Sequence, residues 1–395
     1  MILFAACSSS HHDSGGVMLE PDAPADSPPP STIELELIGS MPTFVALRDG
    51  NGAWQMQTPG QASYSVQVTN DYEFVAVCAD GQGNFDAEWL AATAGDGRQL
   101  VFCGLTMPTG STVDVTGRMV QAGEAQMTDF ASSTTAPWSF DLHVMPGTHD
   151  LVANDATRVL VRRALSIQGA TTLADVDLAA GENLVPVTVE VSNTDPDDAL
   201  VTSVELITSS DAAMLSDGPG SDAMVLPDDL MKPSDFELVE AQATADSFDR
   251  FGSAIYAGSA PSFALPPRLT DATFDSATIT SASWTSLPAF DQVEFEVDGF
   301  GATMGIERVT ATPAWVQATA ASQLAIDTSG ITGYSPSWNV DPTGPYSRSL
   351  AVQQADASGN DLGSAVFDTS GQAFPRAMAG RALRHARMRV ARRAR

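Results

Sequence analysis

The sequence predicts an all-β protein in which tandem β-sandwich modules are followed by a larger β-rich domain. Short runs of alternating apolar and polar residues, which are typical of strands with one buried face, recur from residue 32 onward. Turn sequences rich in Gly, Asn and Asp separate these runs. No helical period longer than about ten residues precedes the C-terminal tail, so we expect one short helix in the body, near residues 86–94.

The strand pattern can be followed along the chain. The clearest hairpin joins residues 44–48 to 53–56 through Asp49-Gly50-Asn51-Gly52, because Asp-Gly and Asn-Gly supply the positive φ that tight turns need. A second hairpin turn is predicted at 356–361. The other runs with strand character are residues 64–68, 74–78, 100–103, 188–191, 293–297 and 349–352.

The chain divides into five predicted segments. A weak internal repeat links the segments that begin at Tyr64 and Trp138, although strand patterning alone could also produce it. The segments are a signal remnant and flexible tether (1–31), a first β-sandwich module (32–110), a second one (111–186), a β-rich domain (187–375) and a basic tail (376–395).

The second module resembles a known family. Its residues 113–117, 140–153 and 159–163 are similar to the opening strand, the late Pro-Gly-containing strand and the following strand of carboxypeptidase-regulatory-like, prealbumin-type sandwiches. His149 stands where that family usually has tyrosine. The resemblance covers only this module and implies an accessory, non-catalytic domain common in secreted proteins. For the first module we expect a comparable immunoglobulin-like or prealbumin-like sandwich.

The charge balance excludes several functions. The 395 residues contain 19 Lys and Arg against 49 Asp and Glu, a net charge of −30, and phosphate binding needs clustered positive charge. We therefore expect no nucleic-acid partner. The one lysine, Lys232, is not part of a P-loop sequence, and no run of apolar residues is long enough for a transmembrane helix. The positive charge gathers in residues 376–395, which hold eight arginines and no acid.

The N-terminus resembles the end of a bacterial lipoprotein signal. Phe4-Ala5-Ala6-Cys7 fits the pattern in which small residues precede a cysteine that is lipidated. No basic residue precedes the short apolar run, so we expect the true start to lie upstream of Met1. The resemblance implies a lipid anchor at Cys7 and an outer-membrane lipoprotein, with residues 8–31 as a tether. The alternative is an incidental cysteine near a frayed terminus.

The two remaining cysteines suggest an oxidising compartment. Cys78 and Cys103 each end an apolar run, and setting Cys7 aside leaves an even number. We expect them to form a disulfide, which in the chain-entropy model contributes roughly 3 kcal/mol. Two buried thiols are the alternative.

No motif predicts catalysis or a cofactor. Alternating oxygen-bearing residues make Asp80, Asn84, Asp86 and Glu88 a weak calcium candidate, as does the acidic turn at 193–198, but a solvated turn is the default for both. The Asp-Thr-Ser-Gly sequences at 327–330 and 368–371 are interpreted as turns after strands, because an extra Ser separates them from an aspartic-protease motif.

Two groups of ring-bearing side chains were also considered. His143 and His149 are the histidines of the body, and we expect neither to be catalytic because no nucleophile motif accompanies them. Aromatic residues of the C-terminal half could form a sugar-binding platform or pack in the core. They are Trp284, Trp315, Tyr334, Trp338 and Tyr346.

These observations predict a non-catalytic lipoprotein of the bacterial cell envelope with a structural or ligand-binding role, facing the periplasm or the surface. The alternatives are a carbohydrate- or protein-binding adhesin and a secreted hydrolase without a recognisable motif. The arginine-rich tail is expected to be disordered or helical, and its deletion is expected to leave the sandwiches folded.

Overall fold

The computed structural model describes most of the chain between residues 30 and 392. The described ranges are 30–103, 112–127, 129–133, 137–245, 248–256, 258–259, 261–275, 277–301, 303–355 and 382–392, with side chains left out of account at 129–133, 354–355 and 382–392. Cys7, the tether, the predicted turn at 356–361 and the Asp-Thr-Ser-Gly sequence at 368–371 lie outside them.

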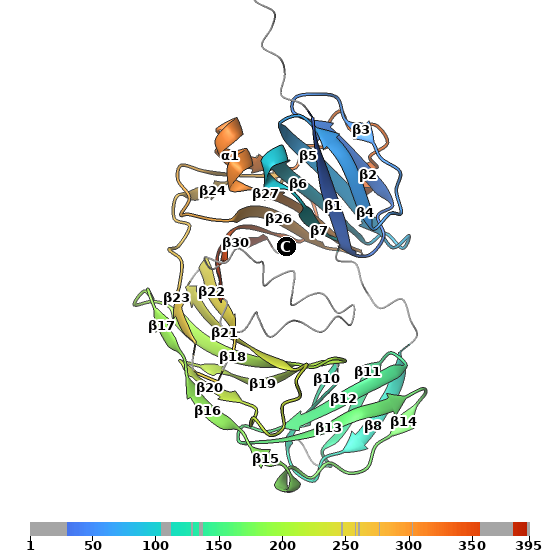
Figure 1. The fold of residues 1–395 in the computed structure, drawn as a ribbon, viewed down its shortest axis with the longest axis vertical. Coiled ribbons are helices and arrows are strands. Elements are labelled where there is room, and N and C mark those ends of the chain that lie inside the picture. The colour runs from blue at the N-terminus through green and yellow to red at the C-terminus, as the bar shows by residue number, and fades with distance from the viewer. Residues whose placement is uncertain are drawn as a thin grey trace, which may run out of the picture.

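The described residues form an all-β fold, as the strand pattern predicts (Figure 1). A twelve-stranded sheet runs from the second sandwich to the first, and all its neighbouring strands are antiparallel except β27 and β6. Its order is β19 (Ala212–Pro219), β18 (Ala199–Ile207), β21 (Phe236–Ala245), β22 (Phe248–Ile255), β30 (Ala382–Arg392), β29 (Tyr346–Ala355), β26 (Gln292–Phe300), β27 (Met304–Ala311), β6 (Phe85–Thr93), β5 (Asp71–Ala79), β2 (Phe44–Asp49) and β3 (Gln55–Met56).

The first sandwich packs the β2–β5–β6 end of this sheet against a smaller sheet. That sheet has the order β4 (Ser63–Val68), β1 (Ser31–Gly39) and β7 (Gln99–Cys103). The 3₁₀ turn η1 (Ala94–Asp96) lies between β6 and β7 in the chain. The alternation of β4, in which Tyr64, Val66 and Val68 are buried, places one apolar face in the core. A disulfide joins Cys78 of β5 to Cys103 of β7, and both cysteines are fully buried. The predicted bridge is confirmed.

The second sandwich is built from two sheets that enclose a separate core. One has the order β10 (Asp129–Ser133), β9 (Gly123–Met127), β12 (Gly147–Asn154), β13 (Arg158–Ile167) and β15 (Glu182–Asn183), and the other β11 (Ser139–Val144), β8 (Val113–Arg118) and β14 (Thr171–Thr172). Leu142, Leu151 and Met119 are among its fully buried side chains, and the 3₁₀ turn η2 (Leu178–Ala180) covers one end.

A buried histidine ties this sandwich to the large sheet. The Nδ1 of His149 on β12 lies 2.9 Å from Oδ1 of Asp211, just before β19, and its Nε2 lies 2.7 Å from the carbonyl oxygen of Met145. The second carboxylate oxygen of Asp211 accepts the backbone N–H of Asp150. The carbonyl oxygen of Met145 can only accept, so the Nε2 of His149 carries a hydrogen in this contact. His149 therefore has a structural role.

Smaller sheets cover the rest of the large one. β16 (Val185–Thr188) pairs with β20 (Asp222–Val225), and β17 (Glu190–Ser192) with β23 (Ser262–Ala264). A third sheet consists of β24 (Ala272–Phe274), β25 (Ser281–Trp284) and β28 (Gln323–Ala325). The helix α1 (Pro313–Thr319) and the 3₁₀ turn η3 (Pro336–Trp338) complete this part. Among the described residues, none of the helices has the length and hydrophobicity to cross a membrane.

The prediction of a short helix near residues 86–94 is wrong. Residues Phe85–Thr93 form β6, in which every residue up to Ala92 is buried. The cause is the place of β6 inside the sheet: it pairs with β5 on one edge and β27 on the other, and apolar cores cover both faces. A strand buried on both faces loses the alternation that distinguishes strands from helices in a sequence.

The expectation of a disordered or helical tail is also wrong for residues 382–392. These residues form β30, which lies between β22 and β29 and is antiparallel to both. The backbone of Met388, for example, is opposite Phe248 on one side and Leu350 on the other. Hydrogen bonding along two edges satisfies the backbone groups that a tail leaves to water. The large sheet thus contains strands from three of the predicted segments, residues 32–110, 187–375 and 376–395.

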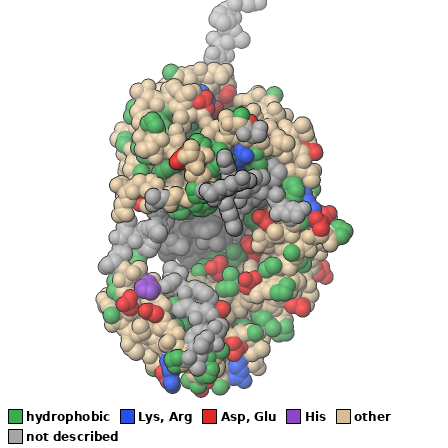
Figure 2. Space-filling view, turned by 180° about the vertical axis from the view of Figure 1, so that it is seen from behind, with side chains coloured by type: hydrophobic (Ala, Val, Ile, Leu, Met, Phe, Trp, Pro, Cys, Tyr) green, Lys and Arg blue, Asp and Glu red, His purple; other side chains and the backbone are tan. Residues whose placement is uncertain are grey.

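Acidic side chains outnumber basic ones on the visible surface (Figure 2). Figure 2 shows Asp and Glu over both halves of the molecule and Lys or Arg at only a few places. This distribution agrees with the excess of 49 acidic over 19 basic residues in the sequence.

The disulfide should control both reactivity and stability. In a Cys7→Ser background, Cys78 and Cys103 should resist alkylation in the native and in the denatured protein, and should react only after denaturation with a reductant. The Cys78→Ala/Cys103→Ala variant should lose about 3 kcal/mol of unfolding free energy, because the unfolded chain is no longer cross-linked. Mass spectrometry and urea unfolding measure the two effects. Alkylation in denaturant alone would contradict the bridge.

Deleting residues 376–395 should lower the melting temperature. The deletion removes a strand that pairs along both edges, and it leaves β22 and β29 as unpaired edges. Removal of residues 393–395 alone, which follow β30, is the matched control and should have little effect. Equal melting temperatures for the full chain and the long deletion would show that β30 contributes nothing to the sheet.

Candidate functional site

A cavity of about 470 Å³ lies on one face of the large sheet. Side chains of β27 and β29 line it from the sheet, and the residues that cover it come from the segment between β24 and β25 and from the segments that follow β28. The lining residues with the most polar side chains are Glu307, Arg348, Asp275, Asn339 and Tyr346. This is a size at which proteins bind small molecules.

The strand register places two of the three charged residues of the cavity, Glu307 and Arg348. Glu307 on β27 is opposite Val297 on β26, and Val297 is opposite Arg348 on β29, so the three residues form one row across the sheet. Residues in one row of a sheet share a face. Glu307 and Arg348 therefore lie on the same face with one strand between them.

Glu307 is a buried carboxyl with one unused oxygen. It is 1% exposed, and its Oε2 accepts the backbone N–H of Val340 at 2.9 Å. Its Oε1 has no hydrogen-bond partner among the described residues. Burial raises the pKa of Glu307 to about 7, although the hydrogen bond from Val340 acts in the opposite direction. At neutral pH the ionised form of this carboxyl can accept a hydrogen bond, and its protonated form can release a proton.

Arg348 is held in place by carbonyl groups and aromatic rings. Its Nη1 donates to the carbonyl oxygens of Asp275 and Thr278 at 2.7 and 2.9 Å, and its guanidinium carbon lies 4.9 Å from the ring centroid of Phe274. The Nε of Arg348 has no hydrogen-bond partner among the described residues. These contacts position a positive charge at the cavity and leave part of its hydrogen-bonding capacity unused.

Sequence reasoning missed Glu307. In β27 the residues Gly305, Val309 and Ala311 lie on the same face as Glu307 and are buried. A single acid among small and apolar residues on one face of a strand could therefore have indicated a buried carboxyl. Such an acid is rare in a core because an ionised carboxyl loses its hydration there. Nothing in the sequence alone shows that Arg348 lies in the same row.

The opposite face of the same strands carries a second group of buried charges. Arg308 forms ion pairs with Glu88 of β6 and with Glu296 of β26, the latter at 2.7 Å. Burial raises the pKa of Glu88 well above its usual range, and the nearby Arg308 counteracts that shift. Because each carboxyl here has an arginine close by, this group is a structural network.

The structure does not assemble the weak calcium candidate. Asp80 closes its own turn: its Oδ1 accepts the backbone N–H groups of Gln82 and Asn84, and its Oδ2 accepts the side-chain amide of Asn84. Asp86 and Glu88 are buried in β6, and Glu88 pairs with Arg308. Sequence spacing suggested a loop, whereas a strand begins at Phe85.

The second acidic turn, at residues 193–198, is neutralised by arginines. Arg250 and Arg268 both pair with Asp198, and Arg268 also pairs with Asp197 at 2.7 Å. A cavity of about 680 Å³ adjoins these residues, but its arginines and acids are paired with one another. Positive side chains thus occupy the position that the calcium hypothesis gave to a cation.

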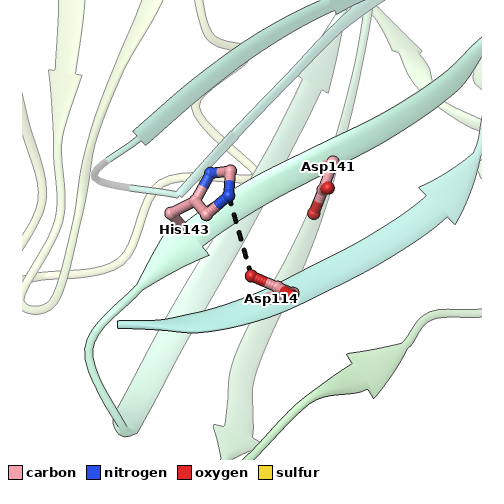
Figure 3. Close-up of side chains that lie close together, drawn as sticks. All are labelled: Asp114, Asp141 and His143. Carbon is pink, nitrogen blue, oxygen red and sulfur yellow. Dashed lines mark ion pairs between the residues drawn. The ribbon is translucent and has the colours of Figure 1, made fainter. Parts of the chain in front are cut away.

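One exposed group combines two acids and a histidine. Asp114 of β8 is opposite His143 of β11, and Asp141 lies two residues before His143 on the same strand face (Figure 3). The Nε2 of His143 is 3.6 Å from Oδ1 of Asp114. All three side chains are exposed, and we interpret the group as a cross-strand ion pair.

Two other sequence interpretations can be compared with the structure. Asp327 follows β28, and its Oδ1 accepts the backbone N–H of Ser329, which confirms a turn for the first Asp-Thr-Ser-Gly sequence. The aromatic residues of the C-terminal half pack in or against the core. Trp284 and Tyr346 are each 7% exposed, and Trp315, Tyr334 and Trp338 are partly buried, with Tyr334 edge-on against Trp338. They do not form an exposed platform.

Comparison with known proteins leaves the family open. No protein-family model matches the chain, and no curated protein matches it significantly. Among solved structures, the tetra-tandem repeat in the extending region of a large adhesion protein aligns with 93% of this chain and 100% of its own length, at 11% sequence identity and a TM-score of 0.11. A TM-score of this size supports no argument about fold or function.

The buried carboxyls should make stability depend on pH. In the folded protein the carboxyl of Glu307 keeps its proton up to about pH 7, whereas in the unfolded chain the same carboxyl ionises near pH 4.5. The unfolding free energy should therefore fall as the pH rises between these values. The shift corresponds to roughly 3 kcal/mol. Urea unfolding of Glu307→Gln between pH 4 and 8 should show a smaller fall than wild type.

Glu237 provides the matched control for this experiment. It is 2% exposed, burial raises its pKa to about 7, and its Oε1 accepts the backbone N–H of Leu226, but it lies on β21 away from the cavity. Glu237→Gln should reduce the pH dependence by a similar amount, and the double variant should reduce it further. An unchanged slope in all three variants would contradict the protonated state of both carboxyls.

Proposed function

We propose that this chain is a non-catalytic, ligand-binding protein of the bacterial cell envelope. The observation that carries the proposal is the unused Oε1 of Glu307, a side chain that is 1% exposed and lines the cavity. A buried polar atom without a partner is costly, and such atoms in native proteins are commonly satisfied by a ligand or a bound water. A ligand that donates a hydrogen bond to Glu307 would remove this cost.

The arrangement of the charged groups supports binding without turnover. Glu307 and Arg348 stand on different strands with Val297 between them, and no ion pair between the two is among the contacts of the described residues. Arg348 is fixed by two backbone carbonyls. An acceptor and a donor held apart in this way recognise two ends of a small molecule.

The proposed compartment is supported by the disulfide and by the resemblance of the N-terminus to a lipoprotein signal. Disulfides persist in oxidising compartments such as the periplasm and the cell surface, and the Cys78–Cys103 bridge is buried. A lipid at Cys7 followed by the tether of residues 8–31 would hold the β-rich body near a membrane. A glycan or a protein as a further ligand of the surface stays a prediction.

Ligand binding at the cavity can be tested by thermal stabilisation. A library of amino acids, amino sugars, monosaccharides and small carboxylic acids is screened against wild type, Glu307→Gln and the control Glu237→Gln. A compound that binds the folded state raises the melting temperature, and the stabilisation grows with the logarithm of its concentration over Kd. We expect hits that stabilise wild type and Glu237→Gln but not Glu307→Gln. Hits that stabilise all three proteins equally, or the lack of any hit, would refute the proposal for this cavity.

The anchor is tested separately. Protein expressed in bacteria with its upstream region should partition into detergent, whereas Cys7→Ser should be released into the aqueous phase because it lacks the acylated thiol. Mass spectrometry of the N-terminal peptide identifies the modification. Aqueous wild-type protein with an unmodified Cys7 would disprove the anchor and leave the cavity experiment untouched.

A further inference from the structure

We infer that the ligand of the cavity is a small zwitterion, whose ammonium group binds Glu307 and whose carboxylate binds Arg348. The inference rests on the proposed function and names the chemical class of the ligand. Three observations lead to it: the unused oxygen of Glu307, the unused donor of Arg348, and the position of both on one row of the sheet.

The first observation concerns Glu307. The side chain is 1% exposed, and its one hydrogen bond comes from the backbone of Val340. An ionised carboxylate in this position needs a positive partner, because burial penalises an isolated charge. A ligand ammonium group supplies a charge and N–H donors to Oε1, which a hydroxyl group supplies only in part.

The second observation concerns Arg348. The hydrogen bonds of its Nη1 go to the backbone carbonyls of Asp275 and Thr278, which are neutral acceptors, while its Nε has none. Arg348 is 9% exposed and remains charged at any physiological pH. A carboxylate is the acceptor that fits a guanidinium best, because its two oxygens can accept parallel N–H groups.

The third observation is the separation of the two groups. They lie on β27 and β29 with β26 between them, so their backbones are roughly 10 Å apart, twice the spacing of neighbouring strands. Glu307 and Arg348 both line the same cavity. A compact molecule with an amine and a carboxylate can span that distance. Binding a zwitterion brings an opposite charge to each of the two groups, although the carboxyl of Asp275, which also lines the cavity, already interacts electrostatically with Arg348.

The apolar part of the lining suggests where the remainder of the ligand lies. Ile279, Ile326, Val340 and Pro342 contribute to the cavity beside the charged pair. They would contact the side chain of an amino acid rather than its charged groups. This composition favours amino acids with an apolar side chain over strongly charged ones.

Calorimetric titration tests the class directly. The probes are the standard L-amino acids together with two analogues of each hit, the amino-acid amide, which lacks the carboxylate, and the deaminated acid, which lacks the amine. We expect at least one apolar amino acid to bind, and each analogue to bind at least tenfold more weakly. Glu307→Gln should lose binding by a similar factor, and Glu237→Gln should bind as wild type does.

Proton release provides a second readout that a structural role of Glu307 would not produce. The pKa of Glu307 is about 7, so near pH 7 about half of the molecules carry a proton there, and an incoming ammonium group should displace it. The observed heat should therefore depend on the ionisation enthalpy of the buffer at pH 7 and lose most of that dependence near about pH 8, where Glu307 is largely ionised and the amino acid still carries its ammonium group. In Glu307→Gln the dependence should be absent.

Three outcomes separate this inference from the proposed function. Binding of an amino acid with loss in both analogues and in Glu307→Gln supports both. A ligand that requires Glu307 but is a neutral sugar, a simple amine or a simple acid overturns the zwitterion and leaves the binding function intact. Amino acids that bind Glu307→Gln as well as wild type, with no other ligand dependent on Glu307, overturn both.

Discussion

The parallel pairing of β6 with β27 is the contact on which the large sheet depends. It joins a strand of the first sandwich to a strand more than two hundred residues later in the chain, and it is the one parallel pair among otherwise antiparallel neighbours. Gly305 permits it: a side chain there would meet the ring of Phe85, which lies 2.4 Å from where its Cβ would stand. Glu307 and Arg308 point to opposite faces because they are consecutive in a strand, and this register places Arg308 opposite Glu88.

These two neighbouring residues illustrate how one strand can serve two purposes. Arg308 faces the side where Glu88 and Glu296 compensate its charge, so that the network holds β6, β27 and β26 together. Glu307 faces the apolar side, where one backbone N–H is its partner. In the first arrangement the buried charges compensate one another, and in the second a costly group is retained. Proteins tolerate such a cost mainly where a binding site requires it.

Much of the fold could be predicted from local sequence, and the exceptions have clear physical causes. Tyr64, Val66 and Val68 alternate in the sequence and in the burial of β4, and Cys78 and Cys103 form the predicted disulfide. Local sequence patterns failed to predict the two strands, β6 and β30, whose structure depends on the strands and cores that surround them. β6 is buried on both faces, and its second half, residues 89–92, is apolar throughout and has no strand period. β30 acquires strand geometry from edges that are distant in sequence.

The candidate site was beyond sequence reasoning for a related reason. The phase of Glu307 with Val309 and Ala311 could have indicated a buried acid. Its relation to Arg348 depends on Val297, which pairs with both, and such a relation follows from register across three strands rather than from spacing. At the Asp80 turn the sequence instead suggested a site that the structure does not form. Its alternating oxygen-bearing residues resemble a cation-binding loop, but the carboxylate of Asp80 already accepts hydrogen bonds from Gln82 and Asn84.

The position of β30 also has a consequence for the order of folding. β22 and β29 are both synthesised before the strand that separates them, so the four strands on one side and the seven on the other have open edges until β30 pairs with them. Open edges are sites at which nascent chains associate with each other. Completion of the sheet therefore depends on the last described strand, and a chain that stalls before Ala382 would carry two unpaired edges until it is degraded.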